Sequence, residues 1–165
     1  MTSLALALTF AALVLAGAMA GFFYAYSMSV MWALDAIDPK AAIVSMQSIN
    51  IVVPNAFFFP AFFGTPVVAL IAAGLWRAQG LHNVALLLAL AAIVYLVGTF
   101  LVTMVLNVPM NARLARTIIP TEIEAARTIW ESYSIPWTLW NHIRTVSSVA
   151  TLGLIGWALY AAGQA

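Results

Sequence analysis

The chain contains no cysteine, which excludes disulfides, thiolate catalysis and cysteine-ligated metal or iron–sulfur centres. Charge is also scarce, because only 7% of the 165 residues are Asp, Glu, Lys or Arg, against about 25% in average soluble domains. Hydrophobic residues make up 65% of the chain, and the net charge is +1. The charge gives no electrostatic basis for binding nucleic acid. The composition predicts an integral membrane protein with a single domain over residues 1–165.

Four apolar stretches are long enough to cross a bilayer, which takes about 20 residues. They cover residues 4–34, 56–76, 84–106 and 136–160. Ala18-Met19-Ala20 resembles a signal-peptide cleavage site, but the apolar run has no preceding Lys or Arg and continues past it, so we interpret it as a retained span. Gly17 and Gly21 form a GxxxG pair, which favours close helix packing. The predicted fold is an all-α integral membrane four-helix bundle.

A short helix is predicted over residues 39–52, in the first connection. Asp38 followed by Pro39 is a favourable N-cap and first-turn pair. Pro54-Asn55 should end this helix, which would lie in the interface or be buried as a short element.

A second short helix is predicted over residues 121–133, in the third connection. Thr121 and Glu124 have the spacing of a capping box, and Arg127 should lie on a water-exposed face. We expect Pro109 to end or bend the third span and Pro136 to open the fourth.

The basic residues give a weak orientation signal. Lys40, Arg113, Arg116 and Arg127 lie in the two longer connections, whereas Arg77 lies in the short turn on the other side. The positive-inside rule therefore places the longer connections in the cytoplasm and both termini outside. The expected location is the cell membrane, with four spans.

A polar cluster opens the fourth span. Trp137, Trp140, Asn141 and Arg144 share one helical face because their spacings are three, four and seven residues. An ionisable side chain at membrane depth costs about 2.5–3.5 kcal/mol, and such residues are usually paired and used. Arg144 could stack on Trp140, one turn earlier. Interfacial anchoring by these residues is the alternative.

His142 points about 160° away from Arg144 around an ideal helix. Both can face one cavity only if the helix is distorted or the ligand is wide. The imidazole could act as a general base, as a haem ligand, or as a structural hydrogen-bond donor.

Amide side chains come to the same membrane level from two other segments. Asn107 and Asn111 flank Pro109, where they could satisfy freed carbonyls or bind a ligand, and Gln47 and Asn50 return to that side. Polar groups that converge in an apolar setting are typical of a ligand pocket. We therefore expect His142 and Arg144 to be catalytic in a shared cavity, with substrate bound by the following side chains: Gln47, Asn50, Asn107, Asn111, Trp137, Trp140 and Asn141.

These residues also carry a family resemblance. In order, the chain contains Ser29-Val30-Met31 with Leu34-Asp35, then Met46-Gln47-Ser48-Ile49-Asn50, Asn107-Val108-Pro109-Met110-Asn111, and Trp137 with Trp140-Asn141-His142-Ile143-Arg144-Thr145. This series resembles the anthrone-oxygenase-like family of small four-span membrane proteins. Trp32 stands where the resemblance leads us to expect a proline.

The resemblance implies oxidation of an anthrone, or of a related lipophilic aromatic or quinol-like molecule, by molecular oxygen. An anthrone is a flat, weakly acidic carbon acid that partitions into a bilayer. Its oxidation needs a base, for which His142 is the candidate, and groups that hold negative charge. Arg144 with Asn107, Asn111 or Asn141 could supply those groups. No metal or other cofactor is expected.

Two other functions remain open from the sequence. The first is a haem-binding membrane protein with His142 as axial ligand. The second is a non-enzymatic accessory subunit or binding protein, in which the same pocket holds a small lipophilic ligand. Either could form a homo-oligomer or part of a larger membrane complex.

Overall fold

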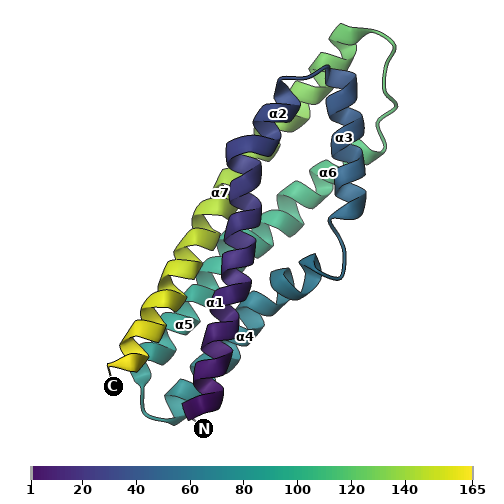
Figure 1. Cartoon of the computed structure of the whole chain (residues 1–165). Coiled ribbons are helices and arrows are strands. Elements are labelled where there is room, and N and C mark those ends of the chain that lie inside the picture. Colours follow the sequence, from purple (N-terminus) through teal and green to yellow (C-terminus); the bar gives the residue numbers. More distant parts are fainter. Residues whose placement is uncertain (1, 165) are drawn as a thin grey trace.

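The computed structural model describes residues 2–164 (Figure 1). Within that part of the chain there is no β-strand, and four helical segments are long and apolar enough to cross a membrane. They comprise Thr2–Asp35, Phe58–Ala78, His82–Ala115 and Ile123–Gly163. The first segment packs on the second and fourth, and the third also packs on the second and fourth. This arrangement confirms the predicted all-α bundle.

Two of these segments contain π-helical turns, in which the backbone hydrogen bond spans five residues. The first segment consists of α1 (Thr2–Ala25), η1 (Tyr26–Val30) and α2 (Met31–Asp35). The third consists of α5 (His82–Tyr95), η2 (Leu96–Leu101), η3 (Thr103–Asn107) and α6 (Val108–Ala115). The helix therefore continues past residue 106, near which the sequence predicted that the span would end or bend. Pro109 lies in the first turn of α6, directly after η3, so the helix runs on through the proline by way of a π-helical turn.

The short helix α3 (Pro39–Val52) has the predicted bounds. The Asp38 carboxylate caps it by accepting hydrogen bonds from the backbone N–H groups of Lys40, at 2.8 Å, and Ala41, at 3.2 Å. After α3 the side chain of Asn55 accepts from the backbone N–H groups of Phe57 and Phe58. This turn leads into α4 (Phe58–Ala78), which is the second span. The cap and the turn fix the direction in which the chain returns to the bundle.

The fourth segment is one continuous helix, α7 (Ile123–Gly163). The prediction of a separate helix over 121–133 followed by a span from Pro136 is therefore wrong, since Pro136 lies inside α7. Tertiary hydrogen bonds hold the helix on the N-terminal side of the proline: the indole N–H of Trp130 donates to the carboxylate of Asp35 at 2.8 Å. Such contacts offset the cost of one lost backbone hydrogen bond.

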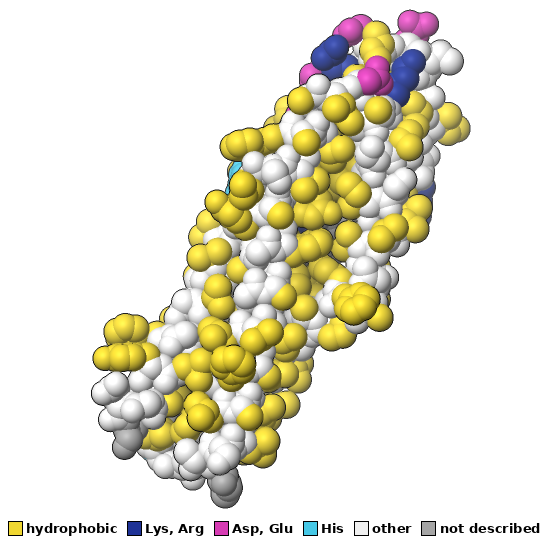
Figure 2. All heavy atoms as spheres, viewed as in Figure 1, with side chains coloured by type: hydrophobic (Ala, Val, Ile, Leu, Met, Phe, Trp, Pro, Cys, Tyr) yellow, Lys and Arg dark blue, Asp and Glu magenta, His cyan; other side chains and the backbone are white. Residues whose placement is uncertain are grey.

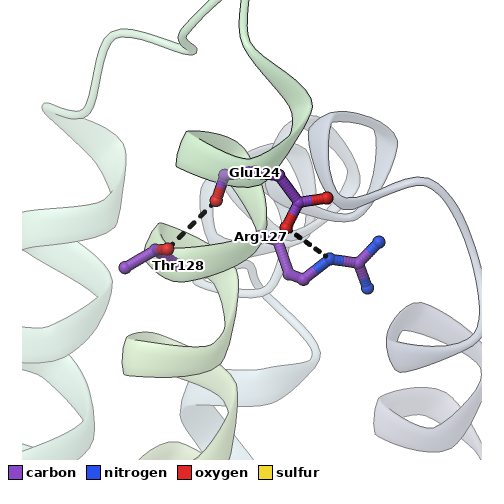
Figure 3. Close-up of polar contacts among 3 residues, drawn as sticks. All are labelled: Glu124, Arg127 and Thr128. Carbon is purple, nitrogen blue, oxygen red and sulfur yellow. Dashed lines mark hydrogen bonds and ion pairs between the residues drawn. The ribbon is translucent and has the colours of Figure 1, made fainter.

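The start of α7 also differs from the capping box that the sequence suggested. Its N-cap is Glu122, which makes no side-chain capping bond. Instead, the backbone carbonyl of Glu124 accepts from the hydroxyl of Thr128 at 3.0 Å, and its carboxylate pairs with Arg127 at 3.4 Å (Figure 3). Arg127 is solvent-exposed, as predicted.

The end of the bundle that carries both chain termini has a core rich in alanine. Small side chains allow close approach of helices in a membrane. Among the glycines, Gly98 lies closest to a neighbouring helix, because a Cβ added there would lie 2.5 Å from the Cβ of Ser147. Gly17 and Gly21 are not in such a contact, because a Cβ would meet Leu152 at an ordinary 3.7 Å or nothing at all. The predicted role of the GxxxG pair in close packing is thus wrong.

Charged side chains gather at the opposite tip, which is formed by the turn between α2 and α3 and by the start of α7 (Figure 2). Hydrophobic side chains are spread over the remainder of the visible face (Figure 2). With four apolar helices of sufficient length, the chain is an integral, multi-pass membrane protein.

Candidate functional site

An aromatic-walled cavity of about 290 Å³ lies between the bundle and α3, on the side toward the charged tip. It is near the lower bound of about 300 Å³ for small-molecule sites. Residues from all four long segments and from α3 line it. Its aromatic lining consists of Phe22, Phe23, Tyr26, Phe58, Phe59, Phe62, Phe63 and Trp137. Flat apolar molecules are the ligands that such a wall favours.

Arg144 is the charged residue in the lining of this cavity, and its side chain is only 4% exposed. The guanidinium carbon lies 4.6 Å from the ring centre of Phe23 and 4.8 Å from that of Trp137. One terminal nitrogen donates to the side-chain carbonyl of Asn141 at 3.0 Å, and the other reaches the hydroxyl of Thr103 at a long 3.5 Å. The Nε atom has no hydrogen-bond partner among the described residues.

Within the part of the chain that the structure describes, no carboxylate neutralises this guanidinium. Over residues 2–164 the ion pair within 4.0 Å is Arg127 with Glu124, at the exposed start of α7. A buried charge without a partner costs about 3–5 kcal/mol, and each aromatic face returns about 2 kcal/mol when desolvated. The aromatic rings thus hold the cation but leave its charge unmatched. A ligand oxygen that accepts from a charged donor would add about 1.5–3 kcal/mol.

The ring that stacks on Arg144 is Trp137, so the expected stacking on Trp140 is wrong. Long side chains on a helix lean toward its N-terminus, and residues seven apart point in nearly the same direction. Trp137 therefore lies beneath the guanidinium. Trp140 is partly buried against the neighbouring hydrophobic core and does not line the cavity.

Asn141 positions Arg144 and does not itself line the cavity. Its amide nitrogen donates to the backbone carbonyl of Phe23 at 2.9 Å and to the hydroxyl of Ser27 at 2.8 Å, which leaves its carbonyl oxygen for the guanidinium. Ser27 lies in the π-helical turn η1 and also contacts the hydroxyl of Thr145 at 2.9 Å. Side chains of α1 and η1 are thus joined to α7 at the depth of the guanidinium.

His142 lies outside the cavity. Its ring nitrogen Nδ1 is 3.0 Å from the hydroxyl of Ser27, and the side chain is exposed beside a shallow apolar groove between α5 and α7 that includes Leu139 and Val146. The expectation that His142 and Arg144 face a shared cavity is wrong, because α7 is regular here and keeps the two side chains about 160° apart. A haem ligated by His142 would lie on the outer surface of the bundle, so the geometry does not fit the haem hypothesis.

Two of the predicted amides line the cavity. The side-chain oxygen of Asn111 accepts from the hydroxyl of Tyr133 and from the indole N–H of Trp137, each at 2.9 Å. Asn50 also lines the cavity, and its amide nitrogen has no hydrogen-bond partner within residues 2–164. Asn50 thus has an unpaired, buried amide nitrogen in a residue of the cavity wall, whereas Asn111 holds the tryptophan.

The other two amides lie elsewhere. Asn107 is fully buried and donates to the backbone carbonyl of Trp137 at 3.3 Å. Gln47 donates to the backbone carbonyls of Leu114, at 2.8 Å, and Thr117, at 3.3 Å, and so ties α3 to the end of α6. Both hold backbone in place, and neither lines the cavity.

Several lining residues carried no signal in the sequence. Phe23, Phe62 and Thr103 lie within apolar runs of the sequence, and helix packing brings them to the cavity wall. Among residues 2–164 there is no group of three or more His, Cys, Asp or Glu side chains that could hold a metal ion.

Comparisons with known proteins identify the family of the chain. A family model described as anthrone oxygenase matches residues 55–154, more than half of the chain, and the match includes α4, the π-helical turns η2 and η3, and Arg144. No curated protein and no solved structure matches the chain. The family is cofactor-independent. This match indicates an oxygenase-like membrane protein, and it shows that the chain belongs to the anthrone oxygenase family.

Proposed function

We propose that the protein is an oxygen-dependent oxidoreductase of the membrane, which oxidises a flat, lipophilic carbon acid of the anthrone type. The single observation that carries this proposal is the buried, unmatched guanidinium of Arg144 between two aromatic rings at the cavity wall. A neutral hydrocarbon gains no attraction between opposite charges from that guanidinium. An aromatic molecule that becomes an anion during its reaction gains most, and it gains after ionisation.

Arg144 holds the ionised substrate in this reaction. Loss of a proton from the methylene carbon of an anthrone places negative charge on the oxygen of the opposite ring carbon. Among the described residues, the Nε–H of Arg144 and the amide N–H of Asn50 are unpaired but buried, so an oxygen in the cavity accepts from them only after these side chains turn toward it. The cavity therefore favours the anion over the neutral molecule.

The proton acceptor is hydroxide that reaches the cavity from water, separately from the substrate. Among the described residues that line the cavity none is a histidine, aspartate or glutamate, so the reaction does not use His142 as a direct base. Hydroxide from water removes the proton and becomes water. The carbanion then adds molecular oxygen to give a peroxide anion, and loss of the second proton from that carbon breaks the O–O bond and releases hydroxide. One anthrone and one O₂ give one anthraquinone and one water.

The test is turnover by the purified chain in lipid nanodiscs. Anthrone should be consumed faster than in empty nanodiscs, with equal amounts of O₂ taken up and anthraquinone formed. With ¹⁸O₂, one labelled atom should enter the new carbonyl. The Arg144→Met variant should fall to the rate of empty nanodiscs, whereas Arg116→Met, which changes an exposed arginine outside the cavity, should not.

A wild-type rate equal to that of empty nanodiscs would end the oxygenase proposal. Tight binding of anthraquinone without turnover would then assign the cavity to the non-enzymatic binding protein that the sequence left open. Wild-type turnover by Arg144→Met would instead show that the guanidinium anchors the helix and takes no part in the reaction.

A further inference from the structure

We propose that the cavity opens sideways into the acyl-chain region of the bilayer and that its ligand enters from the lipid. Besides Pro54 in the turn before α4, four lining side chains on the long segments are also exposed on the outer surface. They are Phe59 and Phe63 on α4, Met104 on η3 and Val108 on α6, with exposed fractions of 44%, 45%, 44% and 42%. A side chain that contacts both the interior and the outside marks a mouth, and we call these four residues the mouth.

The helix packing explains why the bundle is open there. α4 packs along α1 and α5, and its last contacts with the third segment include Phe62 and Phe63 against Phe100. Beyond Phe100 the third segment continues through η3 into α6, which packs on α3 and α7 and not on α4. α4 and the third segment therefore separate beyond the contacts of Phe62 and Phe63 with Phe100, and the mouth lies between them.

The depth of the mouth follows from helical rise. The last turn of α4 carries the exposed Arg77, which marks one face of the membrane. Phe63 precedes it by fourteen residues and Phe59 by eighteen, so they lie about 21 Å and 27 Å away at about 1.5 Å per residue. Both distances fall within a hydrocarbon thickness of about 30 Å. The α4 side of the mouth thus lies inside the hydrocarbon, while Met104 and Val108 lie about 33 Å and 39 Å along the third segment from its first residue, at the far boundary.

The chemistry of the mouth matches that position. All four of its side chains are apolar, and the charged side chains collect at the tip beyond it (Figure 2). A flat aromatic molecule with one polar edge collects at the boundary between acyl chains and headgroups, as tryptophan side chains do. Such a molecule reaches the cavity through this mouth without crossing water, and its polar edge can turn toward Arg144.

The first test measures what surrounds the mouth, and it does not depend on the proposed function. Because the chain has no cysteine, single variants Phe63→Cys and Met104→Cys can carry a nitroxide attached through a disulfide. In nanodiscs the labels should be relaxed by O₂ and shielded from a water-soluble nickel chelate. Leu70→Cys, on the same helix and 46% exposed outside the cavity, is the lipid reference, and Thr128→Cys, at the exposed start of α7, is the water reference (Figure 3).

The second test measures entry, and it rests on the proposed function. The label at residue 63 should remove most of the anthrone turnover that the unlabelled Phe63→Cys variant shows, and a reductant that cleaves the label should return the sample to that variant's own rate. The label at residue 70 should leave turnover unchanged. Nickel accessibility at residues 63 and 104 equal to that at residue 128 would overturn the lipid-facing mouth, as would full turnover with residue 63 labelled. Absence of turnover in unlabelled protein would count only against the oxygenase, because the accessibility result stands by itself.

Discussion

The indole of Trp137 is used at both its edge and its face. Its N–H donates to the side-chain oxygen of Asn111 at 2.9 Å, while the guanidinium of Arg144 lies 4.8 Å from its ring centre. The edge fixes the ring to α6, and the ring supports the cation on α7. Trp137 thus links Asn111, near Pro109, to the charge of Arg144 in the cavity lining. Removal of the indole should therefore affect ligand binding as well as core packing.

Trp137→Phe should weaken binding and turnover of anthrone, whereas Trp140→Phe should behave nearly as wild type. Phenylalanine keeps an aromatic face but loses the hydrogen bond to Asn111, worth about 0.5–1.5 kcal/mol, and it is a weaker cation–π partner than tryptophan. Steady-state kinetics on both variants in nanodiscs checks this. Equal effects of the two changes would argue that both tryptophans only anchor the helix in the interface.

Arg144→Lys should lose most of the activity even though the charge is kept. Lysine has no planar group to lie between Phe23 and Trp137, and it cannot present the same donors to Asn141. Arg144→Met should unfold at a temperature equal to or above that of wild type, since replacing a buried charge by an apolar side chain is often neutral or stabilising. Thermal unfolding in detergent, recorded with the kinetics, separates the two properties. A Lys variant with full turnover would contradict the stacked geometry.

Ser27→Ala should cost more than His142→Ala. The Ser27 hydroxyl is shared by Asn141, His142 and Thr145, so its removal leaves the amide that orients Arg144 without one of its acceptors. Loss of the exposed imidazole removes a single hydrogen bond, worth about 0.5–1.5 kcal/mol. We expect lower turnover for Ser27→Ala and nearly normal turnover for His142→Ala. If His142→Ala is folded and inactive, the imidazole takes part in the reaction through Ser27, and the assignment of the base must be revised.

Gly98→Ala should destabilise the bundle by about 1–3 kcal/mol, the usual cost of overfilling a packed core. The new methyl group would lie 2.5 Å from the Cβ of Ser147 and 2.8 Å from its hydroxyl oxygen, so α7 would have to move away from η2. Gly153→Ala is the control, because a methyl group there would meet nothing within 4 Å, and alanine raises helix propensity by about 1 kcal/mol. Unfolding free energies in mixed micelles should change in opposite directions. An unchanged unfolding free energy in Gly98→Ala would show that this contact does not limit the stability of the bundle.

The helical phase of the sequence indicated that Arg144 and His142 point apart, but the prediction of a shared cavity went against it. The spacing of polar residues was sufficient to bring Asn50 and Asn111 to the same end as Trp137. The cap of α3 was also predictable, because Asp38-Pro39 acts within four residues. The continuity of α7 through Pro136 and of the third segment through Pro109 was not, since tertiary hydrogen bonds and π-helical turns decide what a proline costs there. The partners of the guanidinium could not be predicted either. Phe23 and Thr103 contact it from other helices, and no local pattern in the sequence indicates those contacts.

The unmatched guanidinium of Arg144 interacts differently with the ionised substrate and with the product of the proposed reaction. The ionised substrate neutralises Arg144, whereas the quinone that replaces it carries no charge and leaves the cation again without a counter-charge. Product is therefore held less tightly than the intermediate from which it forms. A protein built in this way resists product inhibition, and it can release a flat, poorly water-soluble quinone into the membrane from which the substrate came.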